Sequence, residues 1–194
     1  IRDGVIVALD AAPPRGAQVI DAGGRLVLPG FQDAHIHLLN GGVDLVEAAQ
    51  LYDCMTLAEL QHTLAAHAAR RKSGVVWGTG WKSGPFGDET LTGAVLDAVV
   101  PDRPCVIVDD SGHNACLNSA ALAAVGINDT TPDPPNSHIL RDARGRATGM
   151  LHEEAVPWAT DRLPQSGDDI WAEGLLAGQA LANRHGITGV LDPS

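Results

Sequence analysis

The sequence predicts an α/β fold, and three observations point to it. Apolar strand-like runs such as 75–81 and 104–110 alternate with helix-like segments such as 57–72. These runs are continuously apolar, which is typical of strands in a parallel sheet covered on both faces. No GxGxxG or GxxxxGK[ST] phosphate-binding motif is present, which counts against a nucleotide-binding doubly wound sheet. We therefore expect part of a (β/α)8 TIM-type barrel.

The first 29 residues are expected to form a small β-unit separate from the barrel. Segments 4–10 and 17–30 are rich in β-branched residues and are separated by the turn-forming stretch AAPPRG. Gly23 and Gly24 mark a hairpin-like turn. Residue 1 is Ile and the first residues already have a strand pattern, so we expect the natural N-terminus to lie upstream.

The barrel region is expected to begin at residue 30 with the strand GFQDAHIH. Gly41 and Gly42 should break the chain before a helix over 43–51. The clearest helix is 57–72, because Thr56 and Glu59 have capping-box spacing and apolar residues recur at helical intervals.

The rest of the chain continues the alternation. The pattern predicts a strand at 75–81, a helix at 92–100, a strand at 104–110 and a helix at 118–126, which Asn118 or Ser119 caps and Gly126 ends. Residues 127–150 are expected to be an insertion with a turn at Arg144-Gly145, followed by a helix over 168–186 and a final strand. These segments supply four or five βα units, whereas a full barrel needs eight and about 250 residues. The chain is therefore expected to be the front portion of a longer enzyme, with the remainder of its own barrel as a partner.

Composition excludes several classes of partner. Thirteen Lys and Arg against 24 Asp and Glu give a formal charge of −11, which disfavours nucleic acids and anionic membranes. No apolar run is long enough to span a bilayer. The three cysteines lack CxxC spacing, which indicates a reducing, cytoplasmic compartment. Export stays open because the N-terminus is expected upstream.

The segment LPGFQDAHIHLLNGG places two histidines, His35 and His37, one residue apart after an apolar run. On an extended strand, side chains at i and i+2 share a face, with Cα atoms about 6–7 Å apart. Such a pair can hold one metal ion, and at the C-terminal end of a barrel strand it would lie where active sites of that fold are built. With eight histidines in the chain an accidental pair is also a reasonable explanation, so the strand and turn before it carry the argument.

Several linked motifs resemble a known family. GGRLVLPGFQDAHIHLLNGG is similar to the opening of the amidohydrolase superfamily, which comprises metal-dependent hydrolases on a (β/α)8 barrel with an accessory β-sandwich. VVWGTGW, PDRPCVIVDDSGHNACLNSAAL, TGMLHEEA and HGITGVLDPS resemble, in order and spacing, the amidohydrolase 3 group, the YtcJ-like enzymes that include N-substituted formamide deformylase. The resemblance implies that residues 1–29 are part of the sandwich and that 30–194 begin the barrel.

The resemblance also implies roles for particular residues. His35 and His37 would be metal ligands, and Glu153 would be a carboxylate ligand, with Glu154 as its competitor. A solvated acid at the start of a helix explains Glu153 equally well. His113 would lie near the substrate pocket, although a loop histidine bonded only to backbone is nearly as reasonable.

Trp81 could line the same mouth, although packing is the commoner fate of a tryptophan. Two imidazoles and a carboxylate suit Zn²⁺, with Fe²⁺, Mn²⁺ or Co²⁺ as alternatives. The implied reaction is hydrolysis of a non-peptide C–N bond in a small amide or formamide by metal-activated water.

The general base and the remaining histidine ligands are expected outside this chain. The chain alone should therefore show no turnover, and it should be poorly soluble or self-associate. The enzyme could be a homo-oligomer. Two other readings stay open. One is a non-catalytic homologue or binding module, and the other is a nucleotide-binding domain without a phosphate loop.

Overall fold

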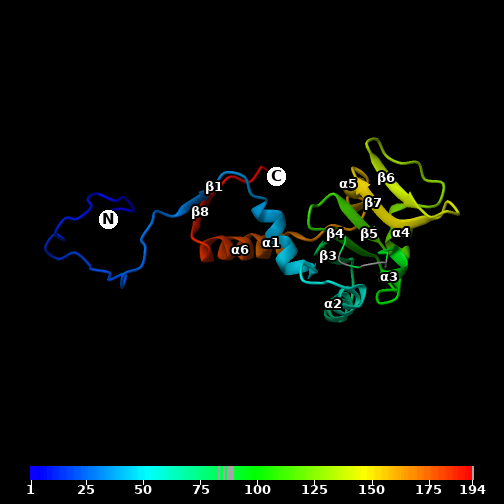
Figure 1. Cartoon of the computed structure of the whole chain (residues 1–194), viewed down its shortest axis with the longest axis horizontal. Helices are drawn as coiled ribbons and strands as arrows, with labels where there is room; N and C mark the ends of the chain where they lie inside the picture. Colours follow the sequence, from blue (N-terminus) through cyan, green and yellow to red (C-terminus); the bar gives the residue numbers. More distant parts are fainter. Residues whose placement is uncertain (83, 85, 87–89, 194) are drawn as a thin grey trace.

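The computed structural model describes residues 1–82, 84, 86 and 90–193 (Figure 1). Its elements, in chain order, are β1 (Phe31–Asp33), α1 (Leu38–Glu47), β2 (Ala49–Gln50), α2 (Leu57–Arg70), β3 (Val76–Trp81), α3 (Gly93–Asp97), β4 (Cys105–Asp109), β5 (Asn114–Leu117), α4 (Ser119–Val125), β6 (Ser137–Arg141), β7 (Ala147–Glu153), α5 (Ala155–Thr160), α6 (Asp168–Arg184) and β8 (Ile187–Val190). Strands and helices mix throughout, as the sequence predicts for an α/β fold.

Six strands form one mixed sheet, in the order β2-β3-β4-β5-β7-β6. The β2–β3 and β3–β4 pairs are parallel, whereas β5, β7 and β6 join by antiparallel pairing. The expectation of a wholly parallel sheet is therefore wrong for this part of the chain. The reason is the tight turn between Asp109 and Asn114, since a parallel neighbour needs a crossover of a dozen or more residues.

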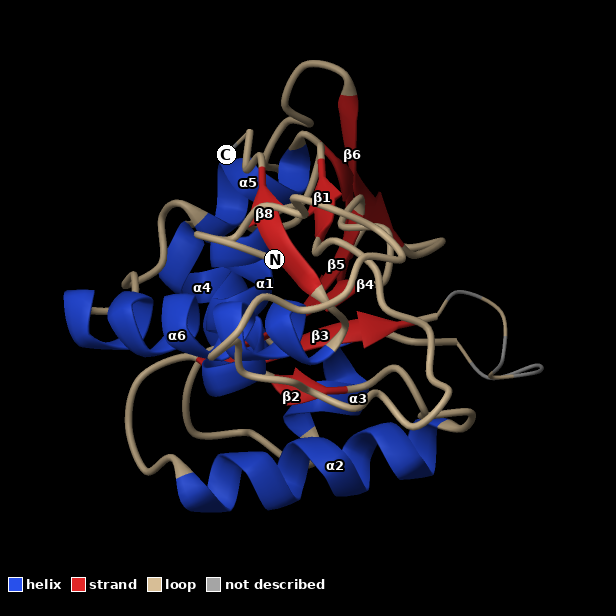
Figure 2. Ribbon diagram, turned by 90° about the vertical axis from the view of Figure 1, so that its left-hand side faces the viewer, coloured by secondary structure: helices blue, strands red, loops and turns tan. Residues whose placement is uncertain are grey.

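Both faces of this sheet are covered. Ile107 points into one apolar cluster with residues of α2 and α3, and its neighbour Val106 points into a second cluster with residues of α4 and α5. In Figure 2, α2 and α5 accordingly lie on opposite sides of the sheet. Continuous apolar strands are the pattern that two covered faces require.

The strands β1 and β8 form a separate parallel pair, in which Phe31 lies opposite Ile187. The chain leaves β1 through α1, builds the six-stranded sheet and returns through α6 to β8. Figure 1 shows α1 and α6 between the β1–β8 pair and the six-stranded sheet. The first expected strand thus pairs with the last one and not with the next one along the chain.

Helix α1 begins at Leu38, and Gly41 and Gly42 lie inside it. The expectation that these glycines break the chain is wrong. A Cβ on Gly42 would stand 2.1 Å from the backbone oxygen of Gly174 in α6, and one on Gly178 would stand 2.8 Å from the Leu38 oxygen. Glycine occupies position 42 of the helix because the two helices approach too closely there for any side chain.

Residues 1–30 contain no strand, only an isolated bridge between Arg2 and Val5. The strands expected over 4–10 and 17–30 are therefore not formed. Apolar side chains in this segment, among them Val7, Ile20 and Leu26, are exposed. A strand needs a partner for its backbone groups, and no described residue outside the segment bonds to the backbone of residues 1–29. The accessory sandwich stays a prediction.

The predicted helix caps and helix ends that depend only on residues close in sequence are confirmed. Thr56 and Glu59 form the reciprocal capping box of α2, and Asn118, not Ser119, caps α4. Gly126 ends α4 in the left-handed conformation. Among the described residues, no helix has the length and apolarity to cross a membrane.

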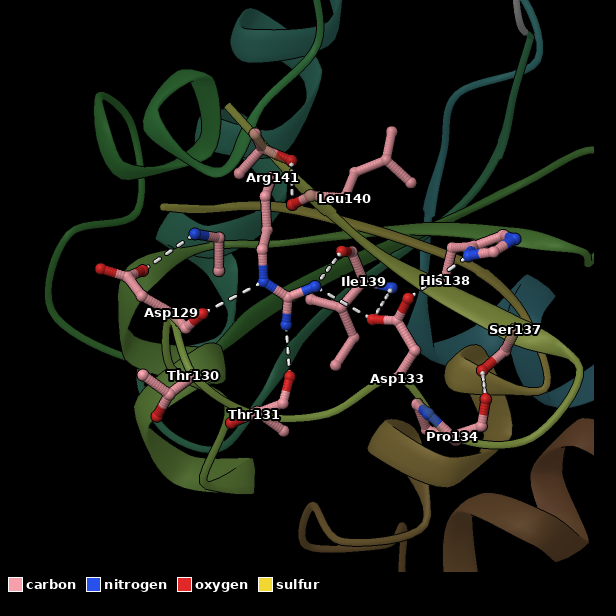
Figure 3. Close-up of polar contacts among 12 residues, drawn as sticks. Asp129, Thr130, Thr131, Asp133, Pro134, Ser137, His138, Ile139, Leu140 and Arg141 are labelled. Atoms are coloured by element: carbon pink, nitrogen blue, oxygen red, sulfur yellow. Dashed lines mark hydrogen bonds and ion pairs between the residues drawn. The ribbon is translucent and has the colours of Figure 1, made fainter. Parts of the chain in front are cut away.

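The expected insertion, residues 127–150, contains β6 and most of β7, which form a hairpin at one edge of the six-stranded sheet. Arg141 holds the segment before the hairpin (Figure 3). Its guanidinium donates to the backbone oxygens of Asp129, Thr131 and Ile139, and one nitrogen lies 3.0 Å from Asp133 Oδ1. This segment is therefore tied to the sheet.

Candidate functional site

His35 and His37 lie in the loop that connects β1 to α1, just beyond the end of the strand. Their ring centroids are 5.5 Å apart, with the ring planes at 82°. Asp33 accepts the backbone N–H of His35 at 3.0 Å, which fixes the turn that follows β1. Two imidazoles on one zinc ion have ring centres roughly 5–6 Å apart, given Zn–N bonds of about 2.0–2.1 Å. The spacing of the centroids is compatible with a shared cation, and it is also the spacing of an edge-to-face contact between two rings.

Asp192, which the sequence reasoning missed, lies beside this pair. It follows β8, and the parallel pairing of β8 with β1 brings the ends of both strands to the same edge. One Asp192 oxygen accepts the backbone N–H of Leu39 at 3.0 Å, and the other lies 3.9 Å from His37 Nδ1. In the sequence, Asp192 is recognisable only as an acid directly after the apolar strand, in LDPS. The sequence does not show that it lies beside His37.

A cavity of about 380 Å³ adjoins His37. It lies between α1, α6 and the β1–α1 loop, and most of its walls are apolar. The lining includes Ile36, Leu45, Tyr52, Leu181 and Ile187. His37 and His185 both line this mainly apolar space, together with Gln50, so it suits a small organic molecule with an apolar body and a polar group.

The structure brings two other predicted residues together at a different place. His113, in the turn between β4 and β5, lies with Nδ1 2.9 Å from Glu153 Oε2 at the end of β7. The Glu153 N–H also donates to the His113 carbonyl at 2.7 Å. Glu153 has φ +54°, a left-handed conformation that glutamate rarely adopts. Such strain costs about 1–3 kcal/mol and clusters at functional sites.

Asp109 organises the turn that carries His113. Its carboxylate accepts hydrogen bonds from the Ser111 hydroxyl, the backbone N–H of His113, and both the backbone and side-chain N–H groups of Asn114. Burial raises the pKa of Asp109, but the bonds from Asn114, Ser111 and His113 outweigh it and hold the pKa below its usual value. A charged Asp109 therefore fixes the backbone on which His113 is mounted.

Trp81 ends β3 and is only 4% exposed, within the apolar cluster that α2 and α3 cover. It offers almost no surface to a ligand in this arrangement. Its indole N–H is buried and has no hydrogen-bond partner among the described residues. The neighbouring segment includes residues 83, 85 and 87–89, which lie outside the described part of the chain.

The predicted metal ligands are not gathered in one place. His35 and His37 follow β1, whereas Glu153 ends β7 in the other sheet. Within the described residues, no three His, Cys, Asp or Glu side chains are grouped closely enough to hold a metal ion. Glu154, the competitor of Glu153, stands at the N-cap position of α5, where its side chain makes no capping bond.

Comparison with known sequences agrees with the motifs. The profile of the amidohydrolase family matches residues 18–194. YtcJ of Bacillus subtilis (strain 168) is 33% identical over 178 residues, covering 83% of this chain and 33% of the relative. The N-substituted formamide deformylase of Arthrobacter pascens is 36% identical over 153 residues, covering 75% of this chain and 27% of the relative.

Solved structures share the fold. An uncharacterized metal-dependent hydrolase from Pyrococcus horikoshii superposes with a TM-score of 0.59 at 24% identity, covering 83% of this chain and 30% of the hydrolase. A second, from Pyrococcus furiosus, has a TM-score of 0.57 at 21% identity, with 83% and 31% covered. The chain spans about a third of the length of the relatives it matches. With the family profile matching most of its residues, the chain belongs to the amidohydrolase family.

Proposed function

We propose that this chain supplies two histidine ligands, His35 and His37, to the divalent-metal site of an enzyme that hydrolyses a small non-peptide amide. The observation that carries the proposal is the pair of imidazole rings 5.5 Å apart beside an apolar cavity of about 380 Å³. Two imidazoles on a short loop provide half of a tetrahedral donor set for zinc, and iron, manganese and cobalt accept the same ligands.

The family supports the chemistry. A bound divalent cation polarises a carbonyl and makes water more acidic, which is the chemistry that amide hydrolysis needs. One relative is named for a formamide substrate, and two solved structures of the same fold are named metal-dependent hydrolases. We take the substrate to be an N-substituted formamide or a similar amide whose apolar substituent fits the cavity beside His37.

Glu153 is the proposed carboxylate ligand, with Glu154 as the alternative. In this arrangement Glu153 contacts His113, so direct metal ligation requires the six-stranded sheet to lie closer to the β1–α1 loop. The other role for Glu153 is to hold His113 where a substrate passes. Metal content separates the two roles, because replacing a ligand removes a metal–oxygen bond, whereas replacing a residue that only holds His113, which is not a predicted ligand, leaves the ligand set intact.

The experiment is a metal analysis and an activity assay on the full protein. His35→Ala and His37→Ala should each lose most of the bound zinc and all N-formyl amine hydrolysis. His62→Ala is the matched control, because His62 is exposed on α2, far from β1 in the sequence. Glu153→Gln should lose zinc if the carboxylate is a ligand. Undiminished zinc in both histidine variants would refute the metal site.

A non-catalytic role is the second candidate, and one observation favours it. A relative that is 33% identical over 159 residues is named as an exoenzymes regulatory protein of Pectobacterium carotovorum. Under this reading the fold is retained for binding, and the full protein would keep its metal without hydrolysing any N-formyl or N-acyl amine. The chain by itself is expected to show no turnover in either case.

A further inference from the structure

We propose that Asp192 is a positioning residue for His37, which orients the imidazole so that its Nε2 faces the metal. The proposal rests on the metal site proposed above. It assigns a role to a residue outside the predicted ligand set, at the end of the strand that pairs with β1.

The backbone fixes where Asp192 stands. Leu191 donates its N–H to the Asp33 carbonyl at 2.9 Å, and Ile36 donates to the Leu191 carbonyl at 3.2 Å. The segment after β8 is therefore bonded on both sides of the His35 turn. Asp192 is the next residue, so these bonds hold its backbone beside the loop that carries His37.

One oxygen of Asp192 acts as the cap of α1. His37 occupies the N-cap position but makes no capping bond with its own side chain. Instead, Asp192 Oδ2 accepts the Leu39 N–H at 3.0 Å, across 153 residues of sequence. The positive end of the helix dipole also favours a carboxylate at this place. Capping fixes the position of the carboxylate.

The second oxygen faces His37. Asp192 Oδ1 lies 3.9 Å from His37 Nδ1, which is too long for a direct hydrogen bond but close enough for a charge to bias the ring. A carboxylate on the Nδ1 side favours the tautomer with its hydrogen on Nδ1, which leaves the Nε2 lone pair for a metal. The Asp192 side chain is 24% exposed and that of His37 is 58% exposed, so the carboxylate is the better fixed of the two.

Asp33, the other acid near the pair, is already used differently. Its Oδ1 accepts the backbone N–H of His35, so it shapes the turn. The two acids thus have different roles: Asp33 holds the loop, and Asp192 orients the His37 ring.

The experiment compares Asp192→Asn with Asp192→Ala in the full protein. Asparagine keeps an oxygen for the Leu39 N–H and therefore keeps the cap, but it removes the charge that faces His37. We expect thermal stability near that of the unchanged protein for Asp192→Asn, and a zinc affinity 10- to 100-fold weaker, as for other residues that orient a ligand. Asp192→Ala should lose both the helix cap and the charge, and therefore both thermal stability and zinc affinity.

A spectroscopic readout tests the orientation directly. In the metal-free protein at alkaline pH, ¹⁵N NMR should show the His37 hydrogen mainly on Nδ1, and Asp192→Asn should move the population toward Nε2. His35 should keep its tautomer in both proteins and serves as the internal control. A purely structural role for Asp192 would leave these ¹⁵N shifts unchanged.

The outcomes separate the two proposals. If Asp192→Asn binds zinc as tightly as the unchanged protein and His37 keeps its tautomer, the positioning role is wrong, while loss of zinc in His37→Ala would still support the metal site. If His37→Ala also retains zinc, both proposals fail together. Weaker zinc binding with an intact melting temperature and a shifted tautomer would establish Asp192 as the residue that orients His37.

Discussion

The six-stranded sheet and the β1–β8 pair differ in how completely packing buries their apolar residues and hydrogen bonds pair their polar groups. The sheet has an apolar cluster on each face, and the side chain of the buried Asn118, directly after β5, makes four hydrogen bonds. The β1–β8 pair has two short strands whose apolar residues, such as Phe31 and Val190, are exposed. The residues proposed to hold the metal belong to the less complete region.

This difference indicates that the two regions are stabilised in different ways. The six-stranded sheet is stabilised by its own packing, whereas the β1–β8 pair depends on what lies next to it. Within the described residues, that neighbour is the contact of α1 with α6, where glycines allow the backbones to meet. The contrast predicts that changes in the sheet lower global stability, and that changes at the helix contact loosen the proposed metal site selectively.

The largest effect is expected at Asn118. Its Oδ1 accepts from the N–H groups of Cys105 and Ala121, and its Nδ2 donates to the carbonyls of Val100 and Arg103. Asn118→Ala would remove the Asn118 partner of all four backbone groups, three of them in buried bonds, and should lower the free energy of unfolding by about 4 kcal/mol. Urea denaturation measures the change. Asn183→Ala, at an exposed position of α6, is the control and should stay within about 0.5 kcal/mol of the unchanged protein.

The helix contact gives the second effect, and two adjacent glycines make a matched pair. A Cβ on Gly42 would lie 2.1 Å from the Gly174 oxygen, whereas a Cβ on Gly41 would meet nothing within 4 Å. Gly42→Ala should therefore destabilise the contact by about 2 kcal/mol. Gly41→Ala should stabilise α1 by about 0.5–1 kcal/mol, since alanine is the better helix former.

Hydrogen exchange locates the damage in Gly42→Ala. Amides of β8 and α6 should exchange faster, while those of β3 and β4 keep their protection. Equal acceleration in both regions would show that the sheet and the β1–β8 pair unfold as one unit, and the comparison would fail.

Features that the sequence predicted correctly are set by neighbouring residues. Thr56 and Glu59 lie three residues apart and cap α2 as expected, and Asn118 and Gly126 begin and end α4. These signals depend on backbone groups within one turn of helix. For the same reason the turn at Gly145 could be placed.

Features that the sequence did not reveal are set by residues far apart in the chain. Strand β5 follows Gly112 in a stretch that resembles a loop, and it forms only because β4 and β7 pair with it. Gly42 lies inside α1, where its lack of a side chain lets α6 pack against the helix. Asp192 lies near His37 only because β8 pairs with β1. The two residues are far apart in the sequence, so the sequence around one could not predict contact with the other.

An effect smaller than that of Gly42→Ala is expected at Asp109, which belongs to the sheet but holds the His113 turn. Because hydrogen bonds keep its pKa below the usual value in the folded state, ionised Asp109 adds stability above the ordinary carboxylate pKa of about 4. That stability is lost as the pH falls from about 4 through the lowered value. Asp109→Asn should lower the free energy of unfolding at neutral pH by about 1 kcal/mol, because one oxygen cannot replace all of these bonds.

The pH dependence identifies the cause. The gap in unfolding free energy between Asp109→Asn and the unchanged protein should be largest above pH 4 and should close as the pH falls. Asp133 and Asp142 also have lowered pKa values, but both proteins contain them, so their contributions cancel in the difference. A gap that stays constant down to pH 2.5 would mean that the charge of Asp109 is irrelevant. The ¹⁵N shifts of His113 should change together with this gap, because the carboxylate that stabilises the turn also holds the histidine beside Glu153.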